Sequence, residues 1–393
     1  MKKILFVDTW TQGKNFIKPL VQNFIENNIK CIYLHADSFY LNEIDNNIKP
    51  IVDLTYEDYD ISEYDNSILK AYEDLKPDAI ITISVHGLFQ RWANHVAEKL
   101  NIPCFFFMHG IRLKDPPKNK SSLKYALNRV VYYSKQFNLF TRDYVRLNSF
   151  SINSVVFLLN YYKELIVFNY RYSNNPKINI GFAYKIMFVN INSDIKYFKE
   201  SYPLSENTEF CLSGNVSALE PAIKSLNIKN KRNQITFISQ PSIIPINEYL
   251  GFIERLNNLF IDTKFNFVFR PHPRDQKKLI EILKSKEIMI SENNAEVDFS
   301  KSLVAVGVNS AMLLGFMKLN IPILQIVDGV NMSICDLNKY ENSFNLEINF
   351  LDSKNASIIN FIENSLKNFS LCNDYLSPTA IISKKIISKF QKK

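Results

Sequence analysis

Short apolar runs alternate with amphipathic stretches along the first part of the chain. Residues 3–8 (Lys-Ile-Leu-Phe-Val-Asp) and 30–35 predict two strands, and residues 15–27 between them carry apolar side chains at helical spacing. The alternation continues with predicted strands at 78–84 and 103–108 and a helix at 88–100. Strands that alternate with helices in this way predict a parallel sheet covered by helices, which is an α/β fold.

A polar stretch of low periodicity, residues 221–233, interrupts this pattern and is predicted to be a linker. The pattern then restarts, with predicted strands at 234–239, 265–270, 288–291, 303–307 and 320–326 and helices at 247–259, 275–285, 312–319, 355–369 and 378–391. We therefore expect a first domain at 1–220, a second at 234–375 and a basic C-terminal helix at 376–393. The predicted fold class is α/β, with two Rossmann-like domains whose parallel sheets face a cleft.

Two segments of the first domain differ from the rest in composition. Residues 36–76 are acidic and rich in tyrosine, and we expect them to be irregular or helical. Residues 118–172 are basic and aromatic and contain no proline or glycine, so we expect a helical insertion. Nine Lys or Arg stand between Arg112 and Arg146, against Asp115 and Asp143.

The basic, aromatic insertion is compatible with several roles. It predicts an anionic partner such as a membrane surface or a phosphorylated ligand, and a helix face packed on the sheet or solvated is the plainer alternative. Stacking on single-stranded nucleic acid is a third reading, but no RNA- or DNA-binding motif accompanies the segment, so nucleic acid is not expected.

Composition places the protein in a broad class. The chain has 393 residues, 46% of them hydrophobic, which fits two domains with a core each. No run of about 18 apolar residues exists, so no transmembrane helix is expected. The five cysteines are far apart and lack metal-ligand spacing, which predicts free thiols in a reducing compartment. We expect a cytoplasmic protein, with peripheral binding to the inner face of the cell membrane as an extension.

Candidate chemistry lies where predicted strands end. The strand at 265–270 runs into Arg270, Pro271, His272, Pro273 and Arg274. The prolines end the hydrogen-bond ladder and stiffen the turn, and a histidine flanked by two arginines suits a phosphate. Such a turn also occurs as an ordinary strand-to-helix connection.

Three further strand ends carry polar or flexible residues. Asp8 ends the first strand, and Gly13 lies in the loop after it. His109 and Gly110 follow the strand at 103–108, with Arg112 close behind; a histidine here suits a general base, or else a structural turn. Asn309 and Ser310 precede the helix at 312–319, where they can cap the helix or help it bind a phosphate.

Taken together, these motifs resemble those of GT-B glycosyltransferases, over most of residues 1–330. The likeness rests on His109-Gly110, the Arg270–Pro273 loop and the Val308–Ala311 turn before Ile321-Pro322, together with the Ser213-Gly214-Asn215 turn. The chain is most similar to bacterial capsule and lipopolysaccharide enzymes, namely transferases that use CMP-sugars (Kdo or sialic acid) and CDP-glycerol glycerophosphotransferases.

The resemblance implies a role for each of these residues. A nucleotide-activated donor would bind the second domain, with Arg270, His272, Arg274, Asn309 and Ser310 at its phosphate. His272 would also be catalytic, by stabilising the charge that builds on the leaving group. His109 would act as the base, with Asp8 as a rival. The loops with Gly13, Gly110 and Arg112 would approach the acceptor, a glycan or lipid-linked glycan. The transfer would be inverting, without metal or further cofactor, since no Asp-x-Asp motif stands at a strand end.

The chain departs from the family pattern at residues 311–316. Many GT-B enzymes place a ribose-binding glutamate there, whereas this stretch reads Ala-Met-Leu-Leu-Gly-Phe, which favours a CMP- or CDP-linked donor over UDP or GDP. CDP-glycerol enzymes often have two serines where Ser310-Ala311 stands. Two alternatives stay open: an enzyme similar to UDP-sugar 2-epimerases, and a non-catalytic nucleotide- or glycan-binding subunit.

Overall fold

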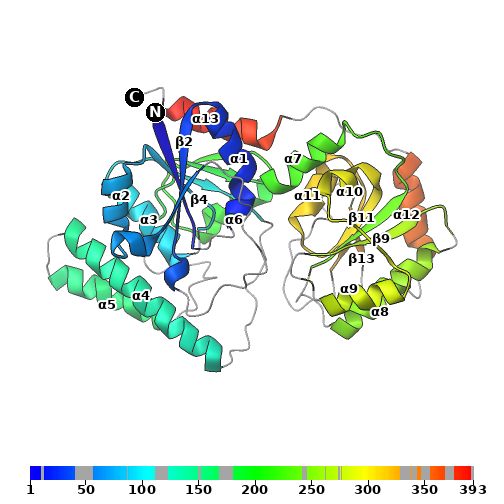
Figure 1. Ribbon diagram of the computed structural model, residues 1–393, viewed down its shortest axis with the longest axis horizontal. Coiled ribbons are helices and arrows are strands. Elements are labelled where there is room, and N and C mark those ends of the chain that lie inside the picture. The colour runs from blue at the N-terminus through cyan, green and yellow to red at the C-terminus, as the bar shows by residue number, and fades with distance from the viewer. Residues whose placement is uncertain are drawn as a thin grey trace. The chain divides into compact units, whose positions relative to one another are not determined.

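The computed structural model describes residues 1–9, 13–39, 56–85, 87–110, 123–148, 152–167, 180–240, 246–261, 263–272, 275, 277–327, 337, 343–346, 355–367 and 376–390. The chain divides into two compact units (Figure 1). Residues 1–109, 119–214 and 379–393 form the first, and the second consists chiefly of residues 215–378. Each unit is built on one parallel sheet.

The first unit contains a seven-stranded sheet in the order β3-β2-β1-β4-β5-β6-β7, with every pairing parallel. Its strands are β1 (Lys2–Val7), β2 (Ile29–His35), β3 (Glu57–Asp60), β4 (Ala79–Thr82), β5 (Cys104–Phe107), β6 (Ile186–Val189) and β7 (Glu209–Leu212). β4 and β5 are buried along their whole length, as continuous apolar runs in a parallel sheet predict.

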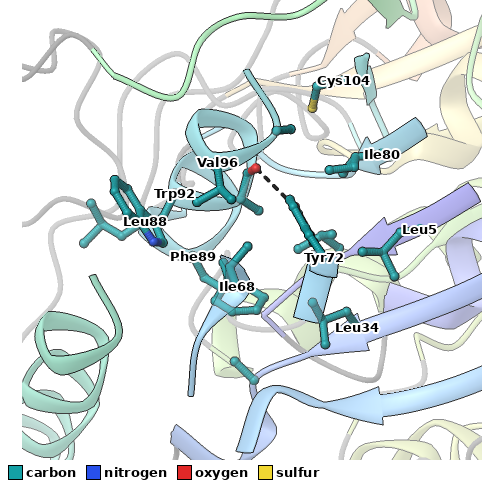
Figure 2. Packing of buried hydrophobic residues seen from close by; sticks show 14 of the residues in the cluster. Leu5, Leu34, Ile68, Tyr72, Ile80, Leu88, Phe89, Trp92, Val96 and Cys104 are labelled. Atoms are coloured by element: carbon teal, nitrogen blue, oxygen red, sulfur yellow. Dashed lines mark hydrogen bonds between the residues drawn. The ribbon is translucent and has the colours of Figure 1, made fainter. Parts of the chain in front are cut away.

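The helices of the first unit are α1 (Lys14–Glu26), η2 (Asp37–Phe39), η3 (Ile61–Tyr64), α2 (Ile68–Leu75), α3 (Leu88–Lys99), α4 (Leu123–Leu147), α5 (Ile152–Val167), α6 (Asn192–Ser201) and α13 (Pro378–Phe390). Figure 2 shows Leu5 of β1, Leu34 of β2 and Ile80 of β4 around Tyr72 of α2, with Trp92 of α3 in the same buried cluster. The Tyr72 hydroxyl donates to the Ala93 carbonyl oxygen at 3.1 Å, which satisfies the one polar atom of this ring in the core.

The described part of the basic, aromatic insertion is helical, as predicted, and packs on the first unit. Asp143 of α4 is fully buried and accepts hydrogen bonds from Trp92 Nε1 (3.0 Å) and from the backbone N–H of Ile68 (2.8 Å), at the start of α2. A carboxylate at the positive end of a helix is favourable. Phe140 packs on Trp92 with ring centroids 4.1 Å apart. These side chains serve the core, which is the plainer of the roles considered.

The second unit contains a six-stranded parallel sheet in the order β10-β9-β8-β11-β12-β13. Its strands are β8 (Gln234–Ile238), β9 (Asn266–Arg270), β10 (Met289–Ile290), β11 (Ser302–Gly307), β12 (Ile323–Ile326) and β13 (Ser343–Leu346). Its helices are α7 (Val216–Ser225), α8 (Ile246–Phe260), α9 (Lys277–Ser285), α10 (Ala295–Lys301), α11 (Ala311–Lys318) and α12 (Asn355–Lys367).

The structure adds elements that the sequence pattern did not predict. Residues 36–76 include the edge strand β3 as well as helices. α7 extends into the segment expected to be a linker, residues 221–233, and the division between the units falls earlier, at Gly214–Asn215. α7 is a helix because its apolar residues are buried against α10 and α11.

Gly315 allows α7 and α11 to pack closely. A Cβ added at Gly315 would lie 2.9 Å from the Ala218 carbonyl oxygen and 2.6 Å from Phe299 Cζ, so only glycine fits there. No helix within the described residues is long and apolar enough to span a bilayer.

Candidate functional site

Strand order determines where each sheet is best suited to bind a ligand. In the first sheet the strand order reverses direction between β1 and β4, and in the second sheet it reverses between β8 and β11. In open parallel sheets, the crevice at this switch point, beyond the carboxyl ends of the strands, is the usual binding site. Asp8 follows β1 and Asn309 follows β11, so both stand at switch points.

The Asp8 carboxyl group is held by three neighbouring groups. Its Oδ1 accepts from the Thr9 backbone N–H (2.7 Å) and from Nε2 of Gln90 on α3 (2.6 Å), and Oδ2 lies 3.5 Å from the Tyr33 hydroxyl. Burial raises the pKa of Asp8 from 3.8 to about 7, although these hydrogen bonds act to lower it. Near neutral pH the group therefore populates both its protonated and its ionised form, as a proton-transfer residue must.

Gly13 brings the start of α1 against Asp8. A Cβ at this position would lie 2.2 Å from Asp8 Oδ2 and 2.4 Å from the Tyr33 hydroxyl, so any other residue would displace these side chains. The sequence predicted Gly13 as a close-approach position for an acceptor. The close approach in the structure is to the chain's own Asp8 and Tyr33, and contact with an acceptor stays a prediction.

His109 lies two residues beyond β5, and its tautomer follows from its hydrogen bond. Nδ1 lies 2.9 Å from the Ile83 carbonyl oxygen, which can only accept, so Nδ1 carries the proton and Nε2 is the basic nitrogen of the neutral ring. Burial lowers the pKa of His109 below 6.5, against the opposite effect of the Ile83 bond. The ring also stacks on Phe16 of α1 at 4.7 Å. A neutral imidazole in one tautomer suits a general base.

Asp8 and His109 belong to one cluster at this sheet edge. The first turn of α1 contacts both, through Gly13 and through Phe16, and Ile83 connects them further, since its side chain lies against Gly13 and its carbonyl binds His109. A Cβ at Gly110 would meet nothing within 4 Å, so the fold itself does not require a glycine there. Arg112 lies outside the described residues.

A group of acidic residues beside this cluster was missed by the sequence reasoning. His35, at the end of β2, has Nδ1 3.2 Å from Asp60 Oδ2 and 3.6 Å from Asp37 Oδ2, and Nε2 3.6 Å from Asp58 Oδ1. Burial acts to raise the pKa of Asp60. Hydrogen bonds from His35, Ser38 and Ser62 have the larger combined effect, so the pKa of Asp60 lies below its usual value. The position of His35 at a predicted strand end was the available signal.

The second sheet edge places its charged residues differently. Arg270 Nε forms a 2.6 Å ion pair with Asp298 Oδ2, and Asp298 Oδ1 accepts from the Ser291 hydroxyl at 2.6 Å. Arg270 therefore has a structural partner within its own unit, and its role at a donor phosphate stays a prediction. Arg274, the other arginine of the predicted phosphate loop, lies outside the described residues.

The turn after β9 is closed through the main chain of His272. Its backbone N–H donates to Asp275 Oδ2 at 2.7 Å, and the Asp275 N–H donates to the His272 carbonyl oxygen at 2.9 Å. The imidazole is therefore not needed to form the turn. Asp275 thus closes this turn through two hydrogen bonds to the His272 main chain.

The ends of β8 and β11 carry polar groups on either side of the switch point. Tyr249 of α8 donates to Ser239 Oγ at 2.8 Å and accepts from the Gln240 N–H at 3.2 Å, which holds the two residues that follow β8. Ser310 caps α11 by accepting from the Met312 N–H at 3.3 Å. Asn309 Oδ1, Gln240 Oε1 and Asp275 Oδ1 are buried and have no hydrogen-bond partner among the described residues.

Sequence comparisons give no relatives. No protein-family model matches the chain. No curated protein matches it either.

Solved structures share the fold. A UDP-GlcNAc 2-epimerase from Neisseria meningitidis bound to UDP-GlcNAc is 15% identical, with all of both chains covered and a TM-score of 0.56. MurG from Acinetobacter baumannii is 10% identical, again with all of both chains covered, at 0.51. A glycotransferase of kitacinnamycin is 10% identical over 99% of this chain and 98% of its own, at 0.53. The predicted fold class, two Rossmann-like α/β domains of the GT-B type, is confirmed.

Proposed function

We propose that the protein is an inverting glycosyltransferase that moves a sugar or a polyol phosphate from a CMP- or CDP-linked donor to a surface polysaccharide or a lipid-linked glycan. The observation that carries the proposal is the neutral His109, fixed in one tautomer at the end of β5 and linked to Asp8 at the switch point through the first turn of α1 and Ile83. The proposed chemistry uses no metal or cofactor besides the donor.

In the proposed reaction, His109 activates the acceptor. As an acceptor hydroxyl attacks the donor, Nε2 of His109 takes its proton, and the electrons of the breaking donor bond pass to the nucleotide phosphate that leaves. The hydrogen bond to Ile83 holds the ring in the productive orientation and stabilises the imidazolium that forms. Asp8 is the rival base, because its pKa of about 7 lets it accept a proton at neutral pH.

The second sheet edge suits the donor. Negative charge grows on the leaving phosphate, and the N-terminus of α11, with Asn309 and Ser310 before it, offers backbone N–H groups and the positive end of a helix dipole. His272 follows β9, which β8 separates from β11, and would be a further phosphate ligand. The buried polar atoms of Gln240, Asn309 and Asp275 favour a ligand with several hydrogen-bonding groups, such as a ribose or a nucleobase.

The start of α11 supports a CMP- or CDP-linked donor. Leu313, Leu314, Gly315 and Phe316 are all buried, so this stretch packs into the domain and presents no acid to a ribose. In many GT-B enzymes that this chain resembles, a glutamate in this region binds the ribose of the donor. Because this chain has no such glutamate, UDP and GDP are the less suitable nucleotides.

A thermal-shift experiment with CMP, CDP, UDP and GDP tests the donor side. CMP or CDP should raise the melting temperature of the wild type, and His272→Ala should lose most of that rise because a phosphate ligand is gone. His95→Gln is the matched control, since His95 lies on α3 in the first unit, and it should keep the full shift. Equal shifts in wild type and His272→Ala would contradict the donor site.

The epimerase alternative is kept because a solved UDP-GlcNAc 2-epimerase shares the fold. Incubating the protein with UDP-GlcNAc alone separates the two activities. A 2-epimer that forms without an acceptor supports the alternative, whereas a transferase leaves the configuration at C2 of the sugar unchanged. If His109→Ala and His272→Ala both still support glycan synthesis in cells, the protein is a non-catalytic binding subunit.

A further inference from the structure

Helix α5 presents a stripe of apolar side chains to solvent. Ile152 is 84% exposed, Val155 38%, Val156 51% and Leu159 63%. The spacing of these residues, i, i+3, i+4 and i+7, places them on one face of the helix. The opposite face is occupied: Leu158 is buried in the core and Phe157 stacks on Tyr144 of α4 at 4.8 Å. The apolar stripe is therefore not needed to hold α5 in place.

The helices that carry this stripe are basic. α4 and α5 lie side by side (Figure 1) and contain six Lys or Arg against two acidic residues, Asp143 and Glu164. Asp143 is fully buried, where it binds the start of α2, so its charge does not reach the surface. Arg142, Val145 and Arg146 are exposed in the last turn of α4, a few residues before α5 begins. Arg142 also donates to the Asp65 backbone carbonyl oxygen, so Arg146 is the exposed arginine nearest in sequence to the apolar stripe.

We propose that the apolar stripe of α5 (Ile152, Val155, Val156 and Leu159) binds the surface of an anionic lipid bilayer. The helix would lie in the plane of the interface, with the stripe among the upper acyl chains and the α4 arginines at lipid phosphates. With 16 residues, α5 is short for a membrane span. A second copy of the chain could bury the apolar stripe but would bring the basic helices of the two copies together. An anionic bilayer can bury the stripe and also attract the basic residues.

This inference rests on the acceptor side of the proposed function, since a lipid-linked glycan is reached at a membrane. Its test needs no turnover, so the two can fail independently. A protein that binds vesicles without responding to any nucleotide keeps this inference and loses the proposed function. A protein that responds to CMP or CDP but ignores vesicles does the reverse.

Vesicle sedimentation is the experiment, with phosphatidylcholine alone and with one quarter phosphatidylglycerol, each at low and high salt. The wild type should bind the anionic vesicles at low salt and lose binding as salt screens the arginines. The double variant Val156→Asn/Leu159→Asn should bind at least about tenfold more weakly. Ile261→Asn is the matched control, because Ile261 is 64% exposed in the second unit, and it should bind as the wild type does.

Circular dichroism shows whether the double variant keeps its helices, and Arg146→Gln gives an independent variant that leaves the stripe intact and should also weaken binding. The inference is wrong if the wild type ignores anionic vesicles at low salt, or if the double variant binds as well as the wild type. It is also wrong if the wild type is a dimer that the double variant turns into a monomer, since a second copy then covers the stripe.

Discussion

The residues at the ends of the strands differ in chemistry between the two sheets. At the first edge a buried carboxyl group, Asp8, has a pKa raised to about 7 and lies in a cluster with a neutral histidine. At the second edge the carboxylates of Asp298 and Asp275 are already engaged, with Arg270 and with the His272 backbone. The first edge is suited to moving a proton and the second to holding an anion. The same fold, used twice in this chain, therefore carries different chemistry at the ends of its strands.

The largest effect should come from removing the basic nitrogen at the first edge. Asn at position 109 can still donate to the Ile83 carbonyl but has no basic nitrogen, so we expect His109→Asn to lower turnover by about 10²- to 10⁴-fold. Donor binding, measured by thermal shift, should not change. His95→Gln is the control and should turn over normally. Full activity in His109→Asn would assign the base to Asp8 instead.

The second-edge carboxylate should matter for stability rather than chemistry. Asp298→Ala leaves Arg270 without its partner in a largely buried site, so we expect a loss of about 2–3 kcal/mol in the free energy of unfolding, measured with urea. Turnover per folded molecule should change little.

An exposed pair provides the control for that measurement. Lys286 and Glu254 pair at 2.9 Å with about two fifths of each side chain exposed, so Glu254→Gln should cost below about 1 kcal/mol. If Asp298→Ala abolishes turnover while the protein stays folded, the two edges do not differ as described.

His272→Ala should weaken donor binding by about tenfold, because one hydrogen bond to a charged phosphate is lost while the turn persists through its main chain. Isothermal titration with CMP and CDP measures it. Asp275→Ala, which opens the turn itself, should weaken binding at least as much. Tight donor binding in both variants would remove this loop from the site.

The smallest effect is a pH dependence of stability from Asp8. Its pKa is raised in the folded state, so the favourable contribution is complete below pH 4 and is lost as pH rises through about 7. Between pH 5 and pH 6 the wild type should lose about 1 kcal/mol from this group, and Asp8→Asn should lack that slope. Urea unfolding at both pH values measures this change. If the free energy of unfolding changes equally with pH in the two proteins, the pKa of Asp8 is not raised by burial.

Much of the fold could be predicted because apolar runs and helical spacing are local signals. The strand ends at Asp8, His109 and His272 could be found in the same way, since a strand end is visible in a single stretch of sequence. β3 could not, because its sequence, Glu-Asp-Tyr-Asp, is unfavourable for a strand. It forms where β2 offers a paired edge and where Lys30, Lys14 and His35 meet its carboxylates.

The residues that tune the site escaped prediction because they are distant in sequence. Gln90 reaches Asp8 across 82 positions, and Asp298 reaches Arg270 across 28. In the sequence each is an ordinary polar residue of a helix. Only the folded arrangement of strands and helices brings it to the strand end. Arg270 illustrates the consequence: next to His272 it looked like a phosphate ligand, whereas its near neighbour in space is a carboxylate.

The C-terminal helix α13 has a consequence for biosynthesis. Ile382 and Ile386 are fully buried, Lys385 and Lys389 pair with Glu209 of β7, and the helix from Thr379 onward belongs to the first unit. Residues 1–214 therefore leave the ribosome without the helix that completes their domain. At about 5–20 residues per second, translation of the second unit holds that surface open for roughly ten to thirty seconds. During this interval the nascent first domain is a natural client for a chaperone.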